Sequence, residues 1–156
     1  MEATAKDFMR LRAVIFDDDP SIRQFLRVVC DQRGYEVFTF PDSGICPLEV
    51  IHRCPCPTGM ICADLIISEM HMLTLNGLDF VEALLTKGCA VPHLALISSG
   101  WAEAERARAI RLGCHLFTKP FTFNQLTSWL GHVETLVAST RRLLDWDAQG
   151  WRGMLR

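Results

Sequence analysis

The sequence contains little that would suit it to a membrane or to nucleic acid. No apolar run approaches the roughly 20 residues that a membrane-spanning helix needs, and the first ten residues, MEATAKDFMR, have no apolar core of the kind found in signal peptides. The 16 basic residues are balanced by 18 acidic ones, for a net charge of −2. We therefore expect a cytoplasmic protein that has neither a membrane nor a nucleic acid as a partner.

The composition also gives no sign of disorder or of a disulfide framework. Hydrophobic residues make up 49% of the chain and charged ones 22%, as in globular proteins, and 156 residues suffice for one domain with its own core. The seven cysteines, an odd number, should be reduced thiols in the cytoplasm. His52, Cys54 and Cys56 could contribute ligands to a metal, but no second half of a zinc site is apparent and the prolines between them favour a loop.

Short apolar segments alternate with amphipathic ones, which predicts alternating strands and helices. The strands are almost wholly apolar, as parallel strands covered on both faces are. Five such units predict an α/β fold, a doubly wound five-stranded parallel sheet with helices on both faces. The predicted strands are Leu11–Phe16, Tyr35–Phe40, Asp64–Ser68, His93–Ile97 and Leu116–Thr118, and the helices begin near residues 20, 47, 77, 102 and 122. The predicted buried faces are Ile22, Phe25, Leu26 and Val29 in the first helix, and Leu78, Val81 and Leu85 in the third.

Polar residues stand where four of these strands end. In a doubly wound sheet, the ligand crevice lies outside the carboxyl ends of the strands. Carboxylates gathered there would bind a hard divalent cation such as Mg²⁺, and a lysine and a hydroxyl beside it would hold phosphoryl oxygens. The sequence therefore predicts a Mg²⁺-dependent phosphoryl site. The residues at the strand ends are Asp17, Asp18 and Asp19, then Ser68 and Glu69, then Ser98 and Ser99, and finally Lys119.

Three segments of the chain resemble a known family. VIFDDDPSIRQFL, DLIISEMHMLTLNGLDF and LFTKPF are similar to the signature blocks of the response-regulator receiver domain of two-component signalling, in the family's order and near its spacing. The resemblance implies a flavodoxin-like sheet with strand order 2-1-3-4-5. It also implies a sensor histidine kinase or phosphotransfer protein and a downstream effector protein as partners, with signalling by protein contact and no enzyme activity.

The resemblance assigns Mg²⁺ ligands to this chain. Asp18 matches the direct ligand, and Asp17 matches the one that acts through water. His71 matches the place whose backbone carbonyl ligates the ion. These assignments make Mg²⁺ the cofactor that the resemblance implies.

Two further positions concern contact with the phosphoryl group. The family's conserved lysine falls on Lys119, whose bond to Pro120 would by resemblance be cis. The family's hydroxyl falls on Ser98 or Ser99, and both remain open. Counting back from Gly113 favours Ser98, whereas the common Ser-Gly pair favours Ser99.

The phosphoacceptor position departs from the family pattern. The family has an aspartate eight residues before a glycine, and eight residues before Gly77 stands Glu69. The metal site that the resemblance implies would therefore include Glu69 in place of aspartate. Leu73 also replaces the usual proline. We expect a receiver that phosphate does not switch in the usual way, either fixed partly in its active state or used as a docking surface.

The aromatic switch position of the family is ambiguous. The interval from Gly113 to Lys119 is one residue shorter than usual. Counting from Lys119 places the switch at Leu116, whereas side-chain type favours Phe117. A residue that is not aromatic would weaken the coupling between the site and the surface.

The sequence divides into an extension over 1–10, a receiver domain over 11–133 and a helical extension over 134–156. Apolar residues predict that the last helix continues through Glu134–Arg142. This helix would either fold back on its own domain or mediate a homodimer or partner contact. The extension is too short for a DNA-binding output domain, so we expect a stand-alone receiver.

Two other classes of protein remain as alternatives. A haloacid-dehalogenase-like phosphatase also has D-x-D after a buried strand, and Asp17-x-Asp19 has this spacing. However, Pro20-Ser21 replaces the expected Gly-Thr, and no adjacent acidic pair for the metal follows Lys119. The other alternative is a structural scaffold with no site.

Overall fold

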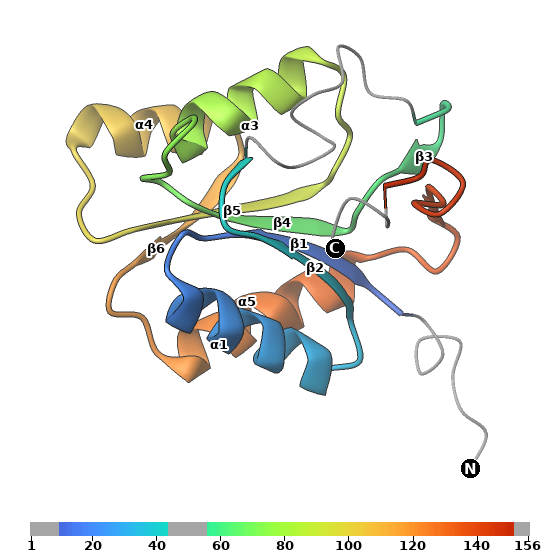
Figure 1. Cartoon of the computed structure of the whole chain (residues 1–156), viewed down its shortest axis with the longest axis horizontal. Helices are drawn as coiled ribbons and strands as arrows, with labels where there is room; N and C mark the ends of the chain where they lie inside the picture. Colours follow the sequence, from blue (N-terminus) through green and yellow to red (C-terminus); the bar gives the residue numbers. More distant parts are fainter. Residues whose placement is uncertain (1–9, 44–55, 152–156) are drawn as a thin grey trace.

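The computed structural model describes residues 10–43 and 56–151, and it confirms the predicted α/β fold (Figure 1). Five parallel strands form one sheet in the order β2-β1-β4-β5-β6. Without the short β3 (Met60–Ile61), which lies outside this sheet, this is the expected order 2-1-3-4-5. The strands of the sheet are β1 (Arg12–Phe16), β2 (Glu36–Phe40), β4 (Leu65–Glu69), β5 (His93–Ser98) and β6 (Cys114–Thr118).

Helices cover both faces of the sheet, as predicted (Figure 1). On one face lie α1 (Pro20–Gln32) and α5 (Phe123–Leu136), and on the other lie α3 (Gly77–Thr86) and α4 (Glu103–Arg111). The helix predicted over 47–53 falls outside the described residues. Among the described residues, no helix combines the length and the apolar character needed to cross a membrane.

Polar side chains cap α1, α3 and α5 soon after the preceding strands end. The Asp19 carboxylate accepts a 2.8 Å hydrogen bond from the backbone N–H of Ser21, and Pro20 occupies the first turn of α1. At α5, Thr122 and Gln125 accept hydrogen bonds from each other's backbone N–H groups. The caps fix where each helix leaves the edge of the sheet, and so they shape the loops there.

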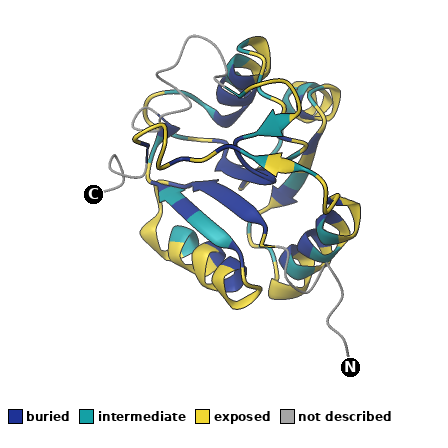
Figure 2. Cartoon of the chain, turned by 90° about the vertical axis from the view of Figure 1, so that its right-hand side faces the viewer, coloured by how far each residue is buried: buried dark blue, intermediate teal, exposed yellow. Residues whose placement is uncertain are grey.

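The core consists of two apolar layers, one on each face of the sheet. Every residue of β1 and β4 is buried, and Figure 2 shows the strands buried between helices whose outer faces are exposed. Two predicted core residues are wrong: Phe25 is 37% exposed and Leu85 is 38% exposed. Leu84 is buried in place of Leu85, because the buried stripe of α3 runs from Gly77 through Phe80 and Val81 to Leu84, at the i, i+3, i+4 and i+7 spacing of a helix face. Phe25 lies at the edge of the layer, where its ring contacts Phe121.

The prediction that the last helix continues through Glu134–Arg142 is wrong. Helix α5 ends at Leu136, and the next residue, Val137, has extended backbone. The chain then forms a short strand, β7 (Arg142–Leu143), which pairs in parallel with β3. The continuous helix through which a homodimer contact was expected is therefore not formed.

Trp146 anchors the segment after α5 to the body of the domain. Its side chain is fully buried, and its ring stacks on Phe38 with 4.1 Å between centroids. The indole N–H donates a 2.9 Å hydrogen bond to the Cys62 carbonyl. Arg12 donates to the same carbonyl at 3.0 Å and to the Leu144 carbonyl at 2.6 Å. The segment thus contributes to the core of its own domain.

A second anchor joins Arg141 to Asp64, which is fully buried. Arg141 makes two parallel contacts of 2.8 Å with this carboxylate. The backbone N–H of Arg12 also donates to Asp64, at 2.8 Å. A buried carboxylate is costly unless it is paired and hydrogen-bonded. Arg141 supplies this pairing for Asp64 and thereby holds the segment after α5 against the domain.

We predict that Trp146→Ala lowers the free energy of unfolding by about 3–5 kcal/mol, because it removes a fully buried ring and leaves a cavity. Phe123→Ala is the control, since Phe123 is 54% exposed and its loss should cost less than about 1 kcal/mol. Urea unfolding of both variants measures the difference. Equal effects of the two substitutions would show that Trp146 does not anchor the segment.

Candidate functional site

The parallel register brings four polar residues to the carboxyl edge of the sheet. Asp17 follows β1, Glu69 ends β4, Ser98 ends β5 and Lys119 follows β6. The first three are buried, with exposures of 0%, 4% and 0%. The last residues of neighbouring strands lie side by side, as Glu69 does beside Ile97 and Ser98 beside Thr118. The four side chains therefore lie close together at this edge.

The closest contact at this edge joins Lys119 and Glu69. Lys119 Nζ lies 2.7 Å from Glu69 Oε2, across the intervening strand β5. Burial by itself would lower the pKa of Lys119, but the hydrogen bond to Glu69 and the charge of Asp17 raise it above its usual value. The lysine therefore stays charged and pairs with the glutamate. The Lys119–Pro120 bond is cis, as the resemblance implies.

Asp17 is the most deeply buried carboxylate of the group. One of its oxygens, Oδ1, accepts a 2.8 Å hydrogen bond from the backbone N–H of Asp19, and the other, Oδ2, is buried without a hydrogen-bond partner among the described residues. Burial raises the pKa of Asp17 to about 6, although the Asp19 hydrogen bond and the charge of Lys119 act in the opposite direction. A buried oxygen without a partner suits a cation.

The donor chemistry at this edge fits Mg²⁺ in part. Asp17 and Asp18 offer carboxylate oxygens, the donors that Mg²⁺ prefers, and Asp18 is exposed to solvent. Glu69 lies against Lys119, and the backbone N–H of His71 donates to its other oxygen at 3.4 Å. Among residues 10–43 and 56–151, no three His, Cys, Asp or Glu side chains are grouped so that they could hold a metal ion. The donors that the structure shows are thus the two aspartates.

The structure distinguishes the two serines by their position. Ser98 is buried at the end of β5, whereas Ser99 is exposed in the loop that follows. The Ser98 hydroxyl donates to the Gly100 carbonyl at 2.7 Å and accepts from the Gly100 N–H at 3.2 Å. Ser98 is therefore the serine at the edge where Lys119 and Glu69 meet, and its hydroxyl is turned toward its own loop.

Comparison with known proteins identifies the family to which the chain belongs. The model of the response regulator receiver domain matches residues 13–130. The chain belongs to this family. As a receiver, it is a signalling module of two-component systems, and members of this family typically bind Mg²⁺.

Two curated relatives are cyanobacterial regulators. The chain is 28% identical over 120 residues to a probable transcriptional regulatory protein of Picosynechococcus, covering 76% of this chain and 47% of the relative. It is also 28% identical over 120 residues to the alkaline phosphatase synthesis transcriptional regulatory protein SphR of Synechococcus elongatus, covering 75% and 46%. The chain thus spans about half the length of these relatives.

A solved structure shows the same fold. The chemotaxis response regulator CheY4 of Vibrio cholerae superposes with a TM-score of 0.64 at 22% identity, over 80% of this chain and 99% of that one. At this identity the likeness concerns the fold, including the parallel five-stranded sheet of this receiver.

The two candidates for the switch position lie on opposite faces of β6. Leu116 is half-buried and packs against the apolar layer on the α3 and α4 side. Phe117 is 4% exposed on the other side, where its ring meets Trp129 edge-on at 5.8 Å. Trp101 also contacts this strand, because its indole N–H donates to the Phe117 carbonyl at 3.4 Å.

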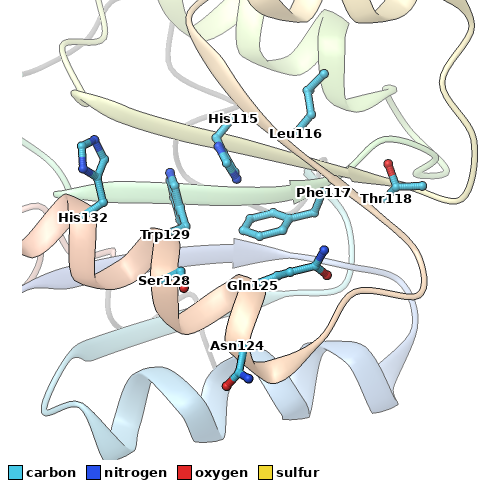
Figure 3. A pocket seen from close by; sticks show the side chains of 9 residues that line it. All are labelled: His115, Leu116, Phe117, Thr118, Asn124, Gln125, Ser128, Trp129 and His132. Carbon is cyan, nitrogen blue, oxygen red and sulfur yellow. The ribbon is translucent and has the colours of Figure 1, made fainter.

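A hollow of about 660 Å³ lies between β6 and α5 (Figure 3). His115 stacks on Trp129 there, with 5.5 Å between ring centroids, and His132 lines the same hollow. Asp17, Glu69 and Lys119 are not among its lining residues. It is therefore separate from the acidic edge.

Sequence reasoning missed two residues that shape the acidic edge. Arg23 donates a 2.6 Å hydrogen bond to the Asp17 carbonyl, and no motif marks an arginine on a helix for that role. Gly77 served only for counting, but a Cβ there would lie 2.7 Å from the Glu69 carbonyl oxygen and 2.9 Å from a Leu96 methyl group. A glycine is therefore required eight residues after Glu69, because the Glu69 backbone leaves no room there for a side chain.

We predict that Gly77→Ala lowers the free energy of unfolding by about 1–3 kcal/mol, because the new methyl group overlaps backbone that cannot move freely. Gly100→Ala is the matched control, since its Cβ would meet nothing within 4 Å. It should change stability by less than about 0.5 kcal/mol. Chemical unfolding compares the two, and an equally mild effect at Gly77 would contradict the steric account.

Proposed function

We propose that this receiver is degenerate, a pseudo-receiver of two-component phosphorelay signalling in which Glu69 occupies the phosphoacceptor position. The observation that carries the proposal is the 2.7 Å ion pair between Lys119 and Glu69 at the carboxyl edge of the sheet. In the resting protein, Lys119 thus contacts a carboxylate where the family would offer it a phosphoryl group. The carboxylate carries one negative charge, less than a phosphate does, so this imitation is partial.

The longer side chain of glutamate disfavours phosphorylation at this position. One additional C–C bond of about 1.5 Å moves the attacking oxygens outward. In-line transfer tolerates little displacement, since an error of about 1 Å can slow a reaction by about 10²-fold. The Glu69 carboxylate is also engaged by Lys119, and the Ser98 hydroxyl by Gly100, so neither group is poised for a phosphoryl group.

Asp17, Asp18 and the backbone carbonyl of His71 would hold Mg²⁺ in this pseudo-receiver. The buried Oδ2 of Asp17, which has no hydrogen-bond partner among the described residues, supports this assignment. When bound, the ion would neutralise the carboxylates and any phosphoryl oxygens beside them.

The partners we propose are a histidine kinase or phosphotransfer protein and a downstream effector protein. Beside Lys119 lies an apolar groove lined by Ile22, Phe25 and Phe121, next to the site that such a partner would have to approach. The output surface would be formed by α4, β6 and α5, with the switch residue at Leu116 or Phe117. The stand-alone arrangement and the cytoplasmic location predicted from the sequence stay predictions.

The phosphatase alternative is not favoured. Asp19, the second aspartate of the D-x-D spacing, caps α1 through its hydrogen bond with Ser21. Membership of the receiver family indicates a signalling module and not a true enzyme. A scaffold with no functional site remains the alternative that the next experiment tests.

We predict that Glu69→Asp gains Mg²⁺-dependent phosphorylation from acetyl phosphate, whereas the wild type takes up none. The substitution retracts the carboxylate by one methylene while Asp17, Asp18 and Lys119 stay in place. Intact-mass measurement should show one added phosphate, and the bond should be stable in acid and labile in base, as an acyl phosphate is. A modest yield is expected, because Leu73 also departs from the family pattern.

The matched control is Asp18→Ala in the Glu69→Asp background, which should abolish the gain because it removes a metal ligand. Phosphorylation of the wild type at any residue, Glu69 included, would contradict the proposal. So would a folded Glu69→Asp protein that binds Mg²⁺ and accepts no phosphate, since the remaining site would then lack the chemistry assigned to it.

A further inference from the structure

The hollow between β6 and α5 has the size of a small-molecule site. Its volume is about 660 Å³, and ligand pockets in proteins typically measure about 300–1,000 Å³. Side chains from both elements line it, among them His115 and Phe117 of β6 and Gln125, Trp129 and His132 of α5 (Figure 3). The proposed receiver function assigns no ligand to this hollow.

Aromatic rings form one wall of the hollow. His115 stacks on Trp129, with 5.5 Å between ring centroids and 16° between ring planes. Phe117 meets both rings edge-on, at 4.7 Å from His115 and 5.8 Å from Trp129. His115 is exposed, so part of its ring is left uncovered. Because aromatic rings pack well against other flat rings, this wall favours a planar aromatic ligand.

The indole N–H of Trp129 has no acceptor within the part of the chain that the structure describes. The residue is 8% exposed, and Figure 3 shows its nitrogen at the end of the ring that is turned toward His115 and His132. A nearly buried indole N–H usually has a hydrogen-bond partner. The missing acceptor must therefore come from water or from an occupant of the hollow, and a carbonyl oxygen would serve.

Gln125 offers a second donor on the same face of α5, one helical turn before Trp129. Its side-chain oxygen already accepts a 2.8 Å hydrogen bond from the backbone N–H of Thr122. The N–H groups of its amide are thus left for a ligand, and they also favour an occupant that carries an acceptor oxygen.

The lining of the hollow carries no fixed charge. Among its described lining residues there is no lysine, arginine, aspartate or glutamate. Burial, together with the charge of His132, lowers the pKa of His115, so the His115 imidazole is neutral at pH 8. Because an ion that leaves water without a partner is costly, such a lining disfavours charged ligands of either sign.

We propose that this hollow binds an uncharged, planar aromatic molecule that carries a carbonyl oxygen. The ring of the ligand packs against the wall formed by His115 and Trp129, and its carbonyl oxygen accepts a hydrogen bond from the indole N–H of Trp129. The hollow lies on the β6 and α5 surface that we propose for output, so an occupant would compete with an effector protein there. That consequence rests on the proposed function, whereas the binding itself does not involve Glu69.

Benzamide is the probe, and benzoate and benzamidine are its matched controls, because the three share a flat ring of one size and differ in charge. Each is titrated at pH 8 into the full chain labelled with ¹⁵N, and NMR follows the indole N–H signals of the four tryptophans. Benzamide should shift the Trp129 signal saturably, with a Kd on the order of 1–10 mM for so small a ligand. Both ions should bind about 10-fold more weakly or worse.

Substitutions on α5 locate the site. Trp129→Phe assigns the indole signal and, followed through the backbone N–H signals of β6, should weaken benzamide binding because the donor is lost. Ser128→Leu places a larger side chain in the hollow and should abolish binding. Thr135→Leu is its matched control, since Thr135 is exposed on the same helix outside the lining, and it should change nothing. Glu69→Asp should bind benzamide as the wild type does, so this proposal and the receiver proposal fail separately.

The proposal is overturned if benzamide gives no saturable shift at Trp129 up to its solubility limit, or if either ion binds as tightly as benzamide does. Shifts centred on Phe25 and Phe121 would place the probe in the groove beside Lys119 and so reject the site. Equal binding by the Ser128→Leu and Thr135→Leu variants would reject it as well.

Discussion

The ion pair between Lys119 and Glu69 is the interaction on which the acidic edge of the sheet depends. It joins residues at the ends of β4 and β6 across β5, with 2.7 Å between Nζ and Oε2. Without Lys119, the carboxylates of Glu69 and Asp17 would lie buried near each other with no cation to balance them, which is costly. Gly77 contributes by leaving room beside the Glu69 backbone, where any side chain would overlap.

The opposite end of the sheet is closed by the segment after α5. Arg141 pairs with the buried Asp64, and Trp146 stacks on Phe38 while its indole N–H is bonded to Cys62. These contacts place a segment beyond the matched receiver region, residues 13–130, within the core of the same domain. The two ends of the sheet therefore differ in their contacts: charge pairing around Glu69 at one end, and the anchoring contacts of Arg141 and Trp146 at the other.

Much of the fold could be predicted because its signals are local. Apolar runs predicted the strands, and the first helix was predicted to begin near residue 20, where Asp19 caps α1. The acidic edge followed from topology alone, since parallel strands end at one edge. The segment after α5 was mispredicted because its contacts are long-range: Arg141 is 77 residues from Asp64 in the sequence. The direction of the Ser98 hydroxyl likewise depends on loop geometry that no motif encodes.

A double-mutant cycle on Glu69 and Lys119 tests the central claim most directly. Free energies of unfolding are measured in urea, without Mg²⁺ or phosphate, for the wild type, Glu69→Gln, Lys119→Met and the double variant. If the ion pair holds the acidic edge together, the coupling energy should be about 1 kcal/mol or more. Additivity of the two substitutions within about 0.5 kcal/mol would contradict the account, because Lys119 and Glu69 would then stabilise the protein independently of each other.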